Sequence, residues 1–383
     1  MKHTIIIGGG GIGSAIAYFL SAMPEAGRIT VIERDPTYRS ASSSLSASSI
    51  RQQFSTPINV QLSQFGYAFM RSMASVAAHS PVGLESRGYL FLGRGDQATS
   101  LRERTRVVRS LGGAVEEFDQ AELTRRYPWI QSDDIVYASQ GTDGEGWFDG
   151  YMLQQWYGSR ARSAGVTYVH GNVSALLTHG SKVAAVELTN GERLVADQVV
   201  NAAGAWSAAL AEMVDVALPV RARRRTVFVV SCPSPPPSFP ILIDSTGVFV
   251  RPEQKHFLCV LSPEALRDHD DLPLDPDFTL FDERIWPALA ERVPAFESLR
   301  IERAWAGYYE FNTVDHNGLV GQVGPENFYV ATGFSGHGLM HSAGVGRGVA
   351  ELLLHGEYRT LDLAPLSPAR LSAGRLIVED AIY

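Results

Sequence analysis

The sequence predicts an α/β fold at its amino terminus, joined to a second lobe built on a mixed or antiparallel sheet. Two observations carry the α/β prediction. An apolar, β-branched strand over residues 4–7 runs directly into a glycine-rich turn at 8–13, and a helical pattern follows to Met23. A second short buried strand, residues 28–33, then ends in a carboxylate. Strand, tight turn, helix and strand in this order are typical of a parallel sheet covered by helices.

The glycine turn has the spacing G-x-G-x-x-G, with glycines at Gly8, Gly10 and Gly13. This spacing lets the chain turn sharply out of a buried strand, approach a pyrophosphate with its backbone, and begin a helix packed closely on the sheet. The free N–H groups at the start of that helix, which include Gly11 and Ile12, then face the phosphates. The pattern predicts a dinucleotide site.

The acid that this kind of site requires is Glu33, at the end of the second strand, and Arg34 follows it. A carboxylate at this place accepts hydrogen bonds from the adenosine ribose hydroxyls and repels a 2′-phosphate, which favours FAD or NAD over NADP. The alternative is an ordinary strand, turn and helix with a glycine-rich corner. Strand, helix and acid together favour the nucleotide site.

Bulk properties describe an ordinary enzyme-sized protein. The 383 residues are enough for two lobes, and the apolar content is 45%. A formal net charge of −8 disfavours a nucleic-acid partner. We find no apolar run long enough to span a membrane, and the amino terminus enters a strand at once, so we expect a cytoplasmic protein without a signal peptide or transmembrane segment. Cys232 and Cys259 have no metal-binding spacing and are interpreted as structural thiols.

Residues 40–49 are rich in serine and by composition alone would be interpreted as a flexible linker. Their position after the second strand favours another interpretation, because this segment passes beneath the cofactor in a dinucleotide fold. Small hydroxyl side chains can there approach the pyrophosphate and the edge of a flavin. The candidate cofactor-binding residues of this segment are Ser42, Ser43, Ser44 and Ser49.

Residues 50–54, Ile-Arg-Gln-Gln-Phe, make the pattern more specific. With the glycine motif, Glu33 and the serine segment, this string resembles the D-amino-acid oxidase superfamily of FAD enzymes, in the branch of sarcosine oxidases, glycine oxidases and D-arginine dehydrogenases. The resemblance implies a Rossmann-like FAD-binding domain of the glutathione-reductase type and a discontinuous substrate-binding domain. The expected FAD-binding domain is formed by residues 1–80, 145–220 and 319–383, and the substrate-binding domain by residues 81–144 and 221–318.

The resemblance assigns further cofactor contacts in the middle of the chain. Residues 170–173 match the place where these enzymes contact adenine by backbone groups, which makes Val173 a candidate, although a simple β-turn is equally compatible with Gly171. Residues 199–206 match a buried strand that breaks against the cofactor. The candidates there are Ala203, Gly204 and Trp206, and Gly204 allows a close approach.

The carboxy-terminal block, residues 305–338, closely resembles the flavin site of the superfamily. A strand ends in glycines and a helix begins, so the positive helix end points at the flavin pyrimidine and stabilises it when reduction makes it anionic. The implied cofactor-binding residues are Gly307, Gly333, Gly336, His337, Gly338, Leu339 and Met340. His337 and His341 are spaced like helical metal ligands, but no third ligand is near in sequence, so no metal is expected. We expect His337 to pack through its backbone and His341 to lie near the substrate cavity or in the core.

Several familiar residues of the superfamily are missing. Monomeric sarcosine oxidases attach flavin through a cysteine where this chain has Gly307, so we expect non-covalent FAD. A lysine that holds the substrate carboxylate is replaced by Met340, and an arginine in the Trp-Ala-Gly strand by Tyr308 or Tyr309. Many members carry tyrosine where this chain has Phe249.

The substrate anchors must then come from elsewhere, because a buried carboxylate needs charge-assisted hydrogen bonds. Arg51 and Arg225 are the candidates, although Arg225 is equally compatible with a solvated basic edge strand. Sarcosine oxidases also place a lysine over the flavin to activate oxygen. Here Lys255 lies at a polar hairpin tip and Cys259 is nearer the matching position, which favours a dehydrogenase that passes electrons to a quinone or protein carrier.

These features indicate an enzyme that removes hydride from the α-carbon of an amino acid or N-methyl amino acid to flavin N5, giving an imine that water hydrolyses. Arg51 and Arg225 would hold the carboxylate, and Phe249 and Tyr309 would shape the pocket. A second hypothesis is oxidation of a 2-hydroxy acid, with His341 as the base. A third is a flavoprotein assembly or scaffold factor, because the Ile-Arg-Gln-Gln-Phe string also resembles the FAD-dependent oxidoreductase-domain group linked to respiratory-complex assembly.

Overall fold

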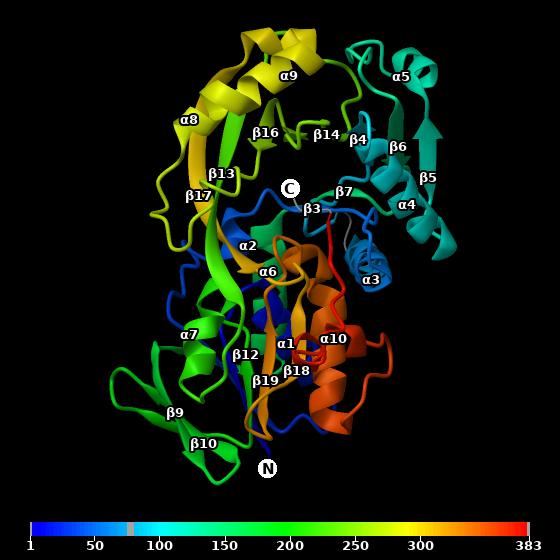
Figure 1. Cartoon of the computed structure of the whole chain (residues 1–383). Coiled ribbons are helices and arrows are strands. Elements are labelled where there is room, and N and C mark those ends of the chain that lie inside the picture. Colours follow the sequence, from blue (N-terminus) through cyan, green and yellow to red (C-terminus); the bar gives the residue numbers. More distant parts are fainter. Residues whose placement is uncertain (1, 75–79, 381–383) are drawn as a thin grey trace.

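The computed structural model describes residues 2–74 and 80–380 of the chain. Two lobes are stacked one above the other, and two long paired strands, β13 (Val220–Ser231) and β17 (Arg300–Asn312), run from one lobe into the other (Figure 1). The amino terminus lies at the far end of the lower lobe, and the red carboxy-terminal segment climbs from the lower lobe towards the junction.

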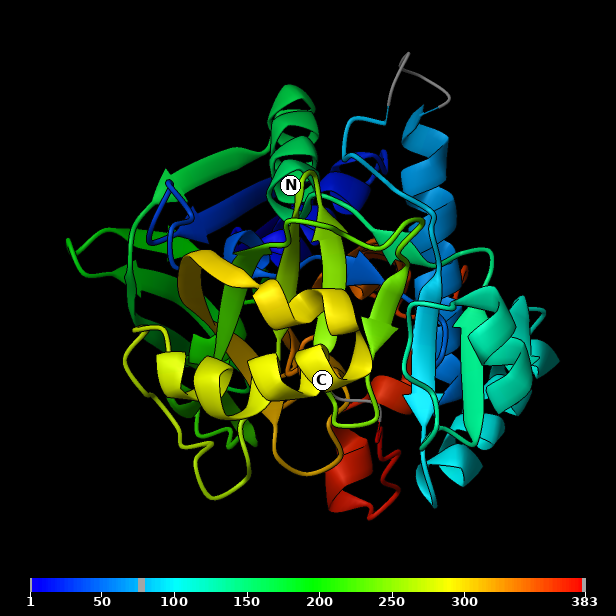
Figure 2. The ribbon, with the colours of Figure 1, turned by 90° about the horizontal axis from the view of Figure 1, so that it is seen from above.

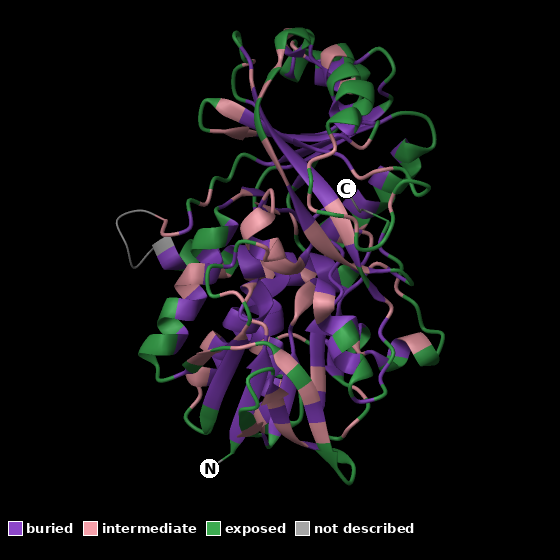
Figure 3. Ribbon diagram, turned by 90° about the vertical axis from the view of Figure 1, so that its left-hand side faces the viewer, coloured by how far each residue is buried: buried purple, intermediate pink, exposed green. Residues whose placement is uncertain are grey.

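The lower lobe is built on a six-stranded sheet in the order β18-β19-β12-β1-β2-β8. The strands are β1 (His3–Ile7), β2 (Arg28–Glu33), β8 (Thr167–His170), β12 (Gln198–Asn201), β18 (Leu319–Gln322) and β19 (Phe328–Thr332). All neighbours pair in parallel except β18 and β19. Strand β1 is buried along its whole length, as the apolar run that forms it requires in a parallel sheet covered on both faces. Buried residues make up much of the strands in the lower lobe (Figure 3).

Helices cover one face of this sheet. Helix α1 (Gly11–Ser21) packs against α6 (Gly150–Ser163) and α10 (Gly338–His355), and α10 also packs against α3 (Pro57–Ala74). Small residues make the contact between α1 and α10 close, because a Cβ added at Gly346 would lie 2.9 Å from the Cβ of Ala15. The other face is covered by a three-stranded sheet and α7 (Ser207–Glu212). The strands of this small sheet are β9 (Val173–His179), β10 (Lys182–Leu188) and β11 (Arg193–Val195).

The upper lobe is built on an eight-stranded sheet in the order β17-β13-β16-β15-β14-β4-β6-β5. Its other strands are β4 (Tyr89–Gly93), β5 (Val115–Phe118), β6 (Tyr137–Gly141), β14 (Ile241–Ile243), β15 (Phe249–Glu253) and β16 (His256–Val260). The pairing is antiparallel except between β14 and β4, so the sheet is mixed. Seen from above, the helices α8 (Phe278–Leu280) and α9 (Trp286–Arg292) lie across it (Figure 2).

The remaining elements connect the lobes or flank the sheets. They are α2 (Ser42–Leu45), β3 (Ser49–Ile50), α4 (Gln97–Ser110), α5 (Gln120–Arg126), β7 (Gly146–Trp147) and α11 (Ala369–Ser372). Among the described residues, no helix is both long enough and apolar enough to cross a membrane.

One local prediction from the sequence is wrong. The proline-rich composition of residues 233–240 predicts a hairpin loop, but the strands that this segment joins, β13 and β14, are separated in the sheet by β16 and β15. The pattern of residues 280–293 predicts a helix, and the structure confirms it, because α8, a π-helical turn at Phe281–Ile285 and α9 follow one another without a break. The helix expected from Ile58 to about Ala78 is α3, and its last expected residues lie outside the described part of the chain.

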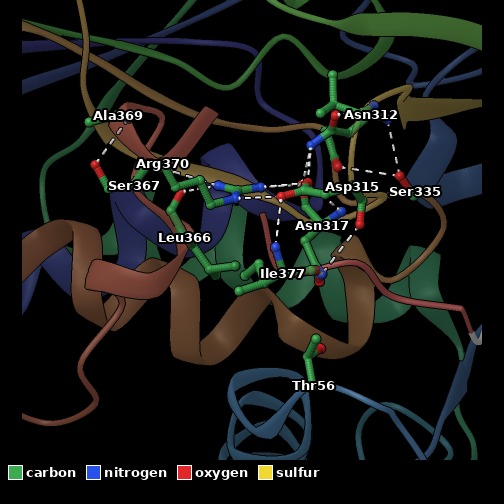
Figure 4. A network of polar contacts seen from close by, with 12 residues as sticks. Thr56, Asn312, Asp315, Asn317, Ser335, Leu366, Ser367, Ala369, Arg370 and Ile377 are labelled. Carbon is green, nitrogen blue, oxygen red and sulfur yellow. Dashed lines mark hydrogen bonds and ion pairs between the residues drawn. The ribbon is translucent and has the colours of Figure 1, made fainter. Parts of the chain in front are cut away.

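A buried ion pair fixes the carboxy-terminal segment beneath the end of β17 (Figure 4). Arg370 donates from Nε to Asp315 Oδ2 at 2.7 Å and from a terminal nitrogen to Asp315 Oδ1 at 2.8 Å, and both side chains are buried. Asn312, the last residue of β17, donates to the same carboxylate at 2.8 Å. This bidentate pair holds the loop between β17 and β18 against residues 366–377, which orients the strands that carry the site.

Candidate cofactor and active site

The glycine turn between β1 and α1 is shaped by contacts that only glycine permits. Gly8 has φ = 101°, and a Cβ there would lie 2.4 Å from the carbonyl oxygen of Ala202. A Cβ at Gly13 would lie 1.8 Å from the carbonyl oxygen of Gly8. At Gly10 the nearest atom is Ser43 Oγ at 3.7 Å, so this side of the turn is open. Gly8 and Gly13 therefore serve the fold, and Gly10 leaves room for a ligand.

Glu33 lies beside this turn, held by backbone hydrogen bonds. Its Oε2 accepts from the N–H of Gly9 at 2.8 Å, and its Oε1 accepts from the N–H of Asp35 at 2.8 Å. Each oxygen keeps a second acceptor position, as two ribose hydroxyls require. Next to it, the Arg34 guanidinium carbon lies 3.5 Å from the ring centroid of Trp206, which places a cation–π pair in the wall.

A cavity of about 340 Å³ extends from Glu33 to the second lobe. Most of the expected cofactor-binding residues line it: Gly8, Gly10, Gly11, Ile12, Glu33, Arg34, Ser42, Ser43, Val173, Ala203, Gly204, Trp206, Gly336, Gly338 and Leu339. Gly13, Ser44, Gly307 and Gly333 are not in its wall. Gly13 packs on Gly8, Gly307 faces Leu45, and Gly333, with φ = 73°, lies beside Val220.

The cavity has the polar groups that a dinucleotide needs. Helix α1 has no side-chain hydrogen bond at its amino-terminal cap, so its first N–H groups are available to phosphate oxygens. The hydroxyl of Ser43, in the cavity wall, is buried and has no hydrogen-bond partner in the described part of the chain. A buried hydroxyl without a partner is costly, and a bound pyrophosphate or ribose would satisfy it. The residues therefore fit FAD.

A smaller cavity of about 50 Å³ meets the first one at Tyr309, Gly336 and Leu339. The expected residues in its wall are Ser49, Arg51, Phe249, Tyr309, His337 and Met340. The wall also contains residues that the sequence did not single out: Ser46, Ala47, Ser48, Tyr89, Val260 and Ser335. Ser49 and Tyr89 form a hydrogen bond of 2.9 Å between their hydroxyls. This arrangement, a small pocket opening on a dinucleotide cavity, is suited to a small substrate presented to a cofactor.

Arg51 is the cation of the small cavity and is 2% exposed. One terminal nitrogen donates to the carbonyl oxygen of Gln53 at 2.8 Å, and the other lies 3.1 Å from His337 Nε2. Because arginine only donates, this His337 nitrogen must accept, so its imidazole is neutral. The guanidinium carbon also lies 4.0 Å from the ring centroid of Phe54. The expectation that His337 packs through its backbone is thus incomplete, since its ring helps to orient Arg51.

The segment that carries Arg51 is held by the side chain of Glu145, the residue before β7. Glu145 Oε1 accepts from the N–H groups of Gln52 and Gln53 at 2.7 and 3.1 Å, and Oε2 accepts from the Gln53 side-chain amide at 2.9 Å. Ser139 donates to the other end of that amide at 2.6 Å. Complete burial raises the pKa of Glu145 to about 7.

Two expected active-site residues lie apart from both cavities. Arg225 forms a bidentate pair with Asp268, at 2.7 and 3.0 Å, and it contacts the pocket only indirectly, with its guanidinium carbon 5.1 Å from the Tyr309 ring centroid. His341 is buried beside α3, with its Nε2 3.2 Å from the Ser63 hydroxyl. Burial lowers the pKa of His341 well below its usual value, so the ring is neutral.

The DAO family, described as FAD dependent oxidoreductase, matches residues 3–352. The chain belongs to the DAO family of FAD-dependent oxidoreductases. FAD is accordingly the cofactor that the large cavity accommodates.

Similar proteins support this membership. The chain is 38% identical to FAD-dependent oxidoreductase domain-containing protein 1 of Xenopus laevis, over 98% of this chain and 83% of that protein. It is 25% identical to human mitochondrial dimethylglycine dehydrogenase, over 96% of this chain and 44% of that protein. Among solved structures, L-proline dehydrogenase from P. horikoshii superposes with a TM-score of 0.86 at 23% identity, covering 98% of this chain and 99% of the other. That structure shows the shared fold.

Glu310, on β17, is a second acidic residue that sequence reasoning missed. It lines the large cavity near Tyr309 and Gly338, at the end opposite Glu33. Its Oε2 accepts from the Thr332 hydroxyl at 2.9 Å and from the N–H of Gly333 at 3.1 Å. Burial raises the pKa of Glu310 to about 7. The only indication in the sequence that Glu310 belongs to the site was the presence of an acidic residue directly after two tyrosines.

Proposed function

We propose that this protein oxidises the Cα–N bond of a small amino acid or N-methyl amino acid to an imine, which water then hydrolyses. The observation that carries the proposal is the position of Arg51. Its buried guanidinium lines a small cavity that opens on the FAD cavity beside Tyr309 and Gly336. A carboxylate bound to Arg51 therefore brings its α-carbon towards the cofactor.

The reaction balances without a further side-chain group. Bound FAD supplies the acceptor for a hydride, at flavin N5. The substrate loses that hydride from its α-carbon and a proton from its nitrogen, so a C=N bond forms. Water adds to this bond and releases an amine and a 2-oxo acid. Because hydride leaves from a neutral amine, no dedicated base is needed.

The chain contributes binding and orientation. Arg51 is positioned by His337 and by the Gln53 carbonyl group, so it presents a fixed cation to a carboxylate in a site shielded from water. Phe249, Tyr309 and Tyr89 enclose the remaining space. A free volume of about 50 Å³ favours a substrate with a small side chain. Human dimethylglycine dehydrogenase and L-proline dehydrogenase, to which the chain is similar, are named for small amino acids with substituted nitrogens, which supports this class.

Arg225 has a different place in the proposal. Its guanidinium binds the carboxylate of Asp268, so it would bind a substrate carboxylate only in exchange for Asp268. We therefore propose Arg51 as the anchor and Arg225 as a second anchor only after such an exchange.

We also propose that FAD is held without a covalent bond. Cys232 and Cys259, the two cysteines of the chain, are buried and line neither cavity. Acid precipitation of the yellow protein is expected to release all flavin into the supernatant. Flavin that pellets with the protein would show a covalent link.

An anaerobic bleaching screen tests the reaction. The FAD-loaded protein is mixed without oxygen with glycine, N-methylated glycines, proline and the matching 2-hydroxy acids, and the visible flavin absorbance is followed. We expect an amino acid with a small side chain to bleach it and the 2-hydroxy acids to leave it unchanged. The 2-hydroxy acid hypothesis has less support, because its candidate base, His341, lies outside the cavity wall. If no compound bleaches the flavin, the scaffold hypothesis replaces the enzymatic one.

The electron acceptor is tested by the same sample. Lys255 is exposed at the turn between β15 and β16, and Cys259 is fully buried. We propose a quinone or protein carrier as the acceptor. Reoxidation of the bleached protein by a soluble quinone should then be much faster than reoxidation by air. Faster reoxidation by air would make the protein an oxidase.

A further inference from the structure

Glu310 lies where three elements meet at the cofactor cavity. It belongs to β17, its carboxylate accepts hydrogen bonds from the end of β19 and the loop after it, and its Oε1 faces the start of α10. A Cβ added at Gly338, the first residue of α10, would lie 3.2 Å from Glu310 Oε1. The same carboxyl group lines the cavity together with Gly336 and Gly338. Glu310 is therefore an acid placed in the part of the FAD site expected to face negative charge.

The amino end of α10 makes this position unusual. The helix is 18 residues long and has no side-chain hydrogen bond at its cap residue, His337, so its positive end faces the cavity. An ionised Glu310 therefore lies at the same positive helix end as any negative charge that the ligand carries there. Two negative charges in one dry site repel each other strongly, because the low local dielectric screens them little.

The groups around Glu310 offer it no compensating cation. Tyr308 and Tyr309 lie near Glu310 on β17, and Ala222 is its partner in register on β13. Thr332, at the end of β19, donates a hydrogen bond to it, and His337, the cap residue of α10, is neutral. Arg223, next to Ala222, is paired with Asp270. No ion pair to Glu310 occurs among residues 2–74 and 80–380. Desolvation dominates, and the pKa of Glu310 is raised to about 7.

We propose that Glu310 exchanges a proton with solvent as the redox state of the bound FAD changes. With the flavin beside Gly336 and Gly338, as the resemblance of residues 305–338 implies, two-electron reduction would add negative charge to this end of the cavity. The carboxylate of Glu310 then takes one proton from water and becomes a neutral carboxylic acid, and oxidation of the cofactor releases that proton again. The proposal depends on FAD as the cofactor and not on the identity of the substrate, so it stands or falls separately from the proposed reaction.

Glu310→Gln separates this role from a purely structural one. A glutamine can still accept the hydrogen bond from the Gly333 N–H, but it cannot take up a proton. Glu145→Gln is the matched control, since Glu145 is a buried acid whose pKa is likewise raised to about 7 but which lines neither cavity. All proteins are used as the full FAD-loaded chain, reduced electrochemically.

Two measurements read the proton without relying on turnover. The first is the infrared difference spectrum of reduced minus oxidised protein, recorded above the pKa of about 7. We expect a positive band of a protonated carboxyl group, sensitive to deuterium, in the wild type and Glu145→Gln but not in Glu310→Gln. The second is the pH dependence of the FAD midpoint potential, which should become shallower in Glu310→Gln by up to one proton per two electrons.

An unchanged band and an unchanged pH dependence in Glu310→Gln would overturn the proposal and leave Glu310 a structural ligand of Gly333. If Glu310→Gln does not retain FAD, Glu310→Asp replaces it, because aspartate keeps the titratable group in a changed environment. A band that shifts in Glu310→Asp supports the proposal. A band at the wild-type frequency, or no band in the wild type at any pH, contradicts it.

Discussion

Arg51 and Arg225 show how much the partner of a side chain decides its role. Both guanidinium groups are buried, and both lie near Tyr309. Arg225 forms a bidentate pair with Asp268 and lines neither cavity. Arg51 lines the small cavity, donates to the Gln53 carbonyl oxygen, and interacts electrostatically with the carboxyl groups of Glu145 and Glu379. A carboxylate in the small cavity can therefore reach Arg51 directly, whereas it reaches Arg225 only in exchange for Asp268.

Arg51→Ala is predicted to weaken binding of a small carboxylate ligand. Hydrogen bonds to a charged group contribute about 1.5–3 kcal/mol, so the dissociation constant should rise roughly 10- to 150-fold. Titration of the flavin spectrum with a non-oxidisable substrate analogue measures this constant. Arg284→Ala, at an exposed surface pair with Glu264, is the control and should bind as the wild type does. Equal affinity in Arg51→Ala and the control would remove Arg51 from the site.

Arg225→Ala is predicted to act mainly on stability. It leaves the half-buried Asp268 without its partner, and breaking a buried ion pair costs about 3–5 kcal/mol. Urea unfolding should show the loss, and the double variant Arg225→Ala with Asp268→Ala should recover part of it. If the ligand dissociation constant rises while stability is unchanged, Arg225 is an anchor after all.

At the scale of elements, the turn from β1 into α1 illustrates which features are local enough to predict. The glycine spacing, the helix start and the acid at the end of β2 lie within a stretch of 33 residues, and the structure forms them as predicted. Asp119 followed three positions later by Glu122 predicts a capped helix start, and α5 begins there, with Asp119 accepting from the N–H of Glu122 at 2.8 Å.

Gly10→Ala and Gly13→Ala are predicted to differ. At Gly13 the new methyl group meets the Gly8 carbonyl oxygen at 1.8 Å, so the turn must open and the protein should be strongly destabilised. At Gly10 the methyl group meets only Ser43 Oγ, at an ordinary contact distance of 3.7 Å, so the fold should persist while FAD affinity falls because the phosphate approach is blocked. Thermal unfolding of the apoprotein and fluorescence titration with FAD separate the two effects. A Gly10→Ala variant that binds FAD normally would place the pyrophosphate elsewhere.

The features that the sequence did not predict depend on contacts between distant segments. Asp268 reaches Arg225 from a loop 43 positions away, and Glu145 reaches Gln53 from 92 positions away. Neither contact produces a periodic pattern in the sequence. Each one depends on how β13, β6 and the loops around them pack in the folded chain. The family resemblance could supply the cofactor and most of the residues that line its cavity. It assigned no role to Glu310, although residues 305–338, which include Glu310, were matched to the flavin site of the superfamily.

At the scale of the whole molecule, buried acids make stability depend on pH. Glu145 and Glu310 hold protons in the folded state up to about pH 7, whereas in the unfolded chain they lose them near 4.5. Between these values the folded state binds more protons, so the free energy of unfolding falls as pH rises. His341 acts in the opposite direction, because its pKa is lowered on folding.

A comparison of variants isolates the acids from His341. The stability of the wild type minus that of the Glu145→Gln, Glu310→Gln double variant should decrease as pH rises from 4.5 through about 7. The full change corresponds to roughly 3 kcal/mol per carboxyl group, since one pKa unit is about 1.4 kcal/mol. Chemical denaturation of the apoprotein at several pH values gives this difference. A difference independent of pH would mean that both acids titrate normally.

The cofactor cavity is lined by residues from both ends of the chain, with Gly8 to Ile12 on one side and Gly336 to Leu339 on the other. Residues 8–339 must therefore all be synthesised before a complete FAD site exists. The central strand β1 must wait for β12, and β12 for β19, before this side of the sheet is paired. Loading with FAD is consequently a step that follows synthesis of these residues, and until FAD binds the folded chain lacks the stabilisation that a bound ligand gives.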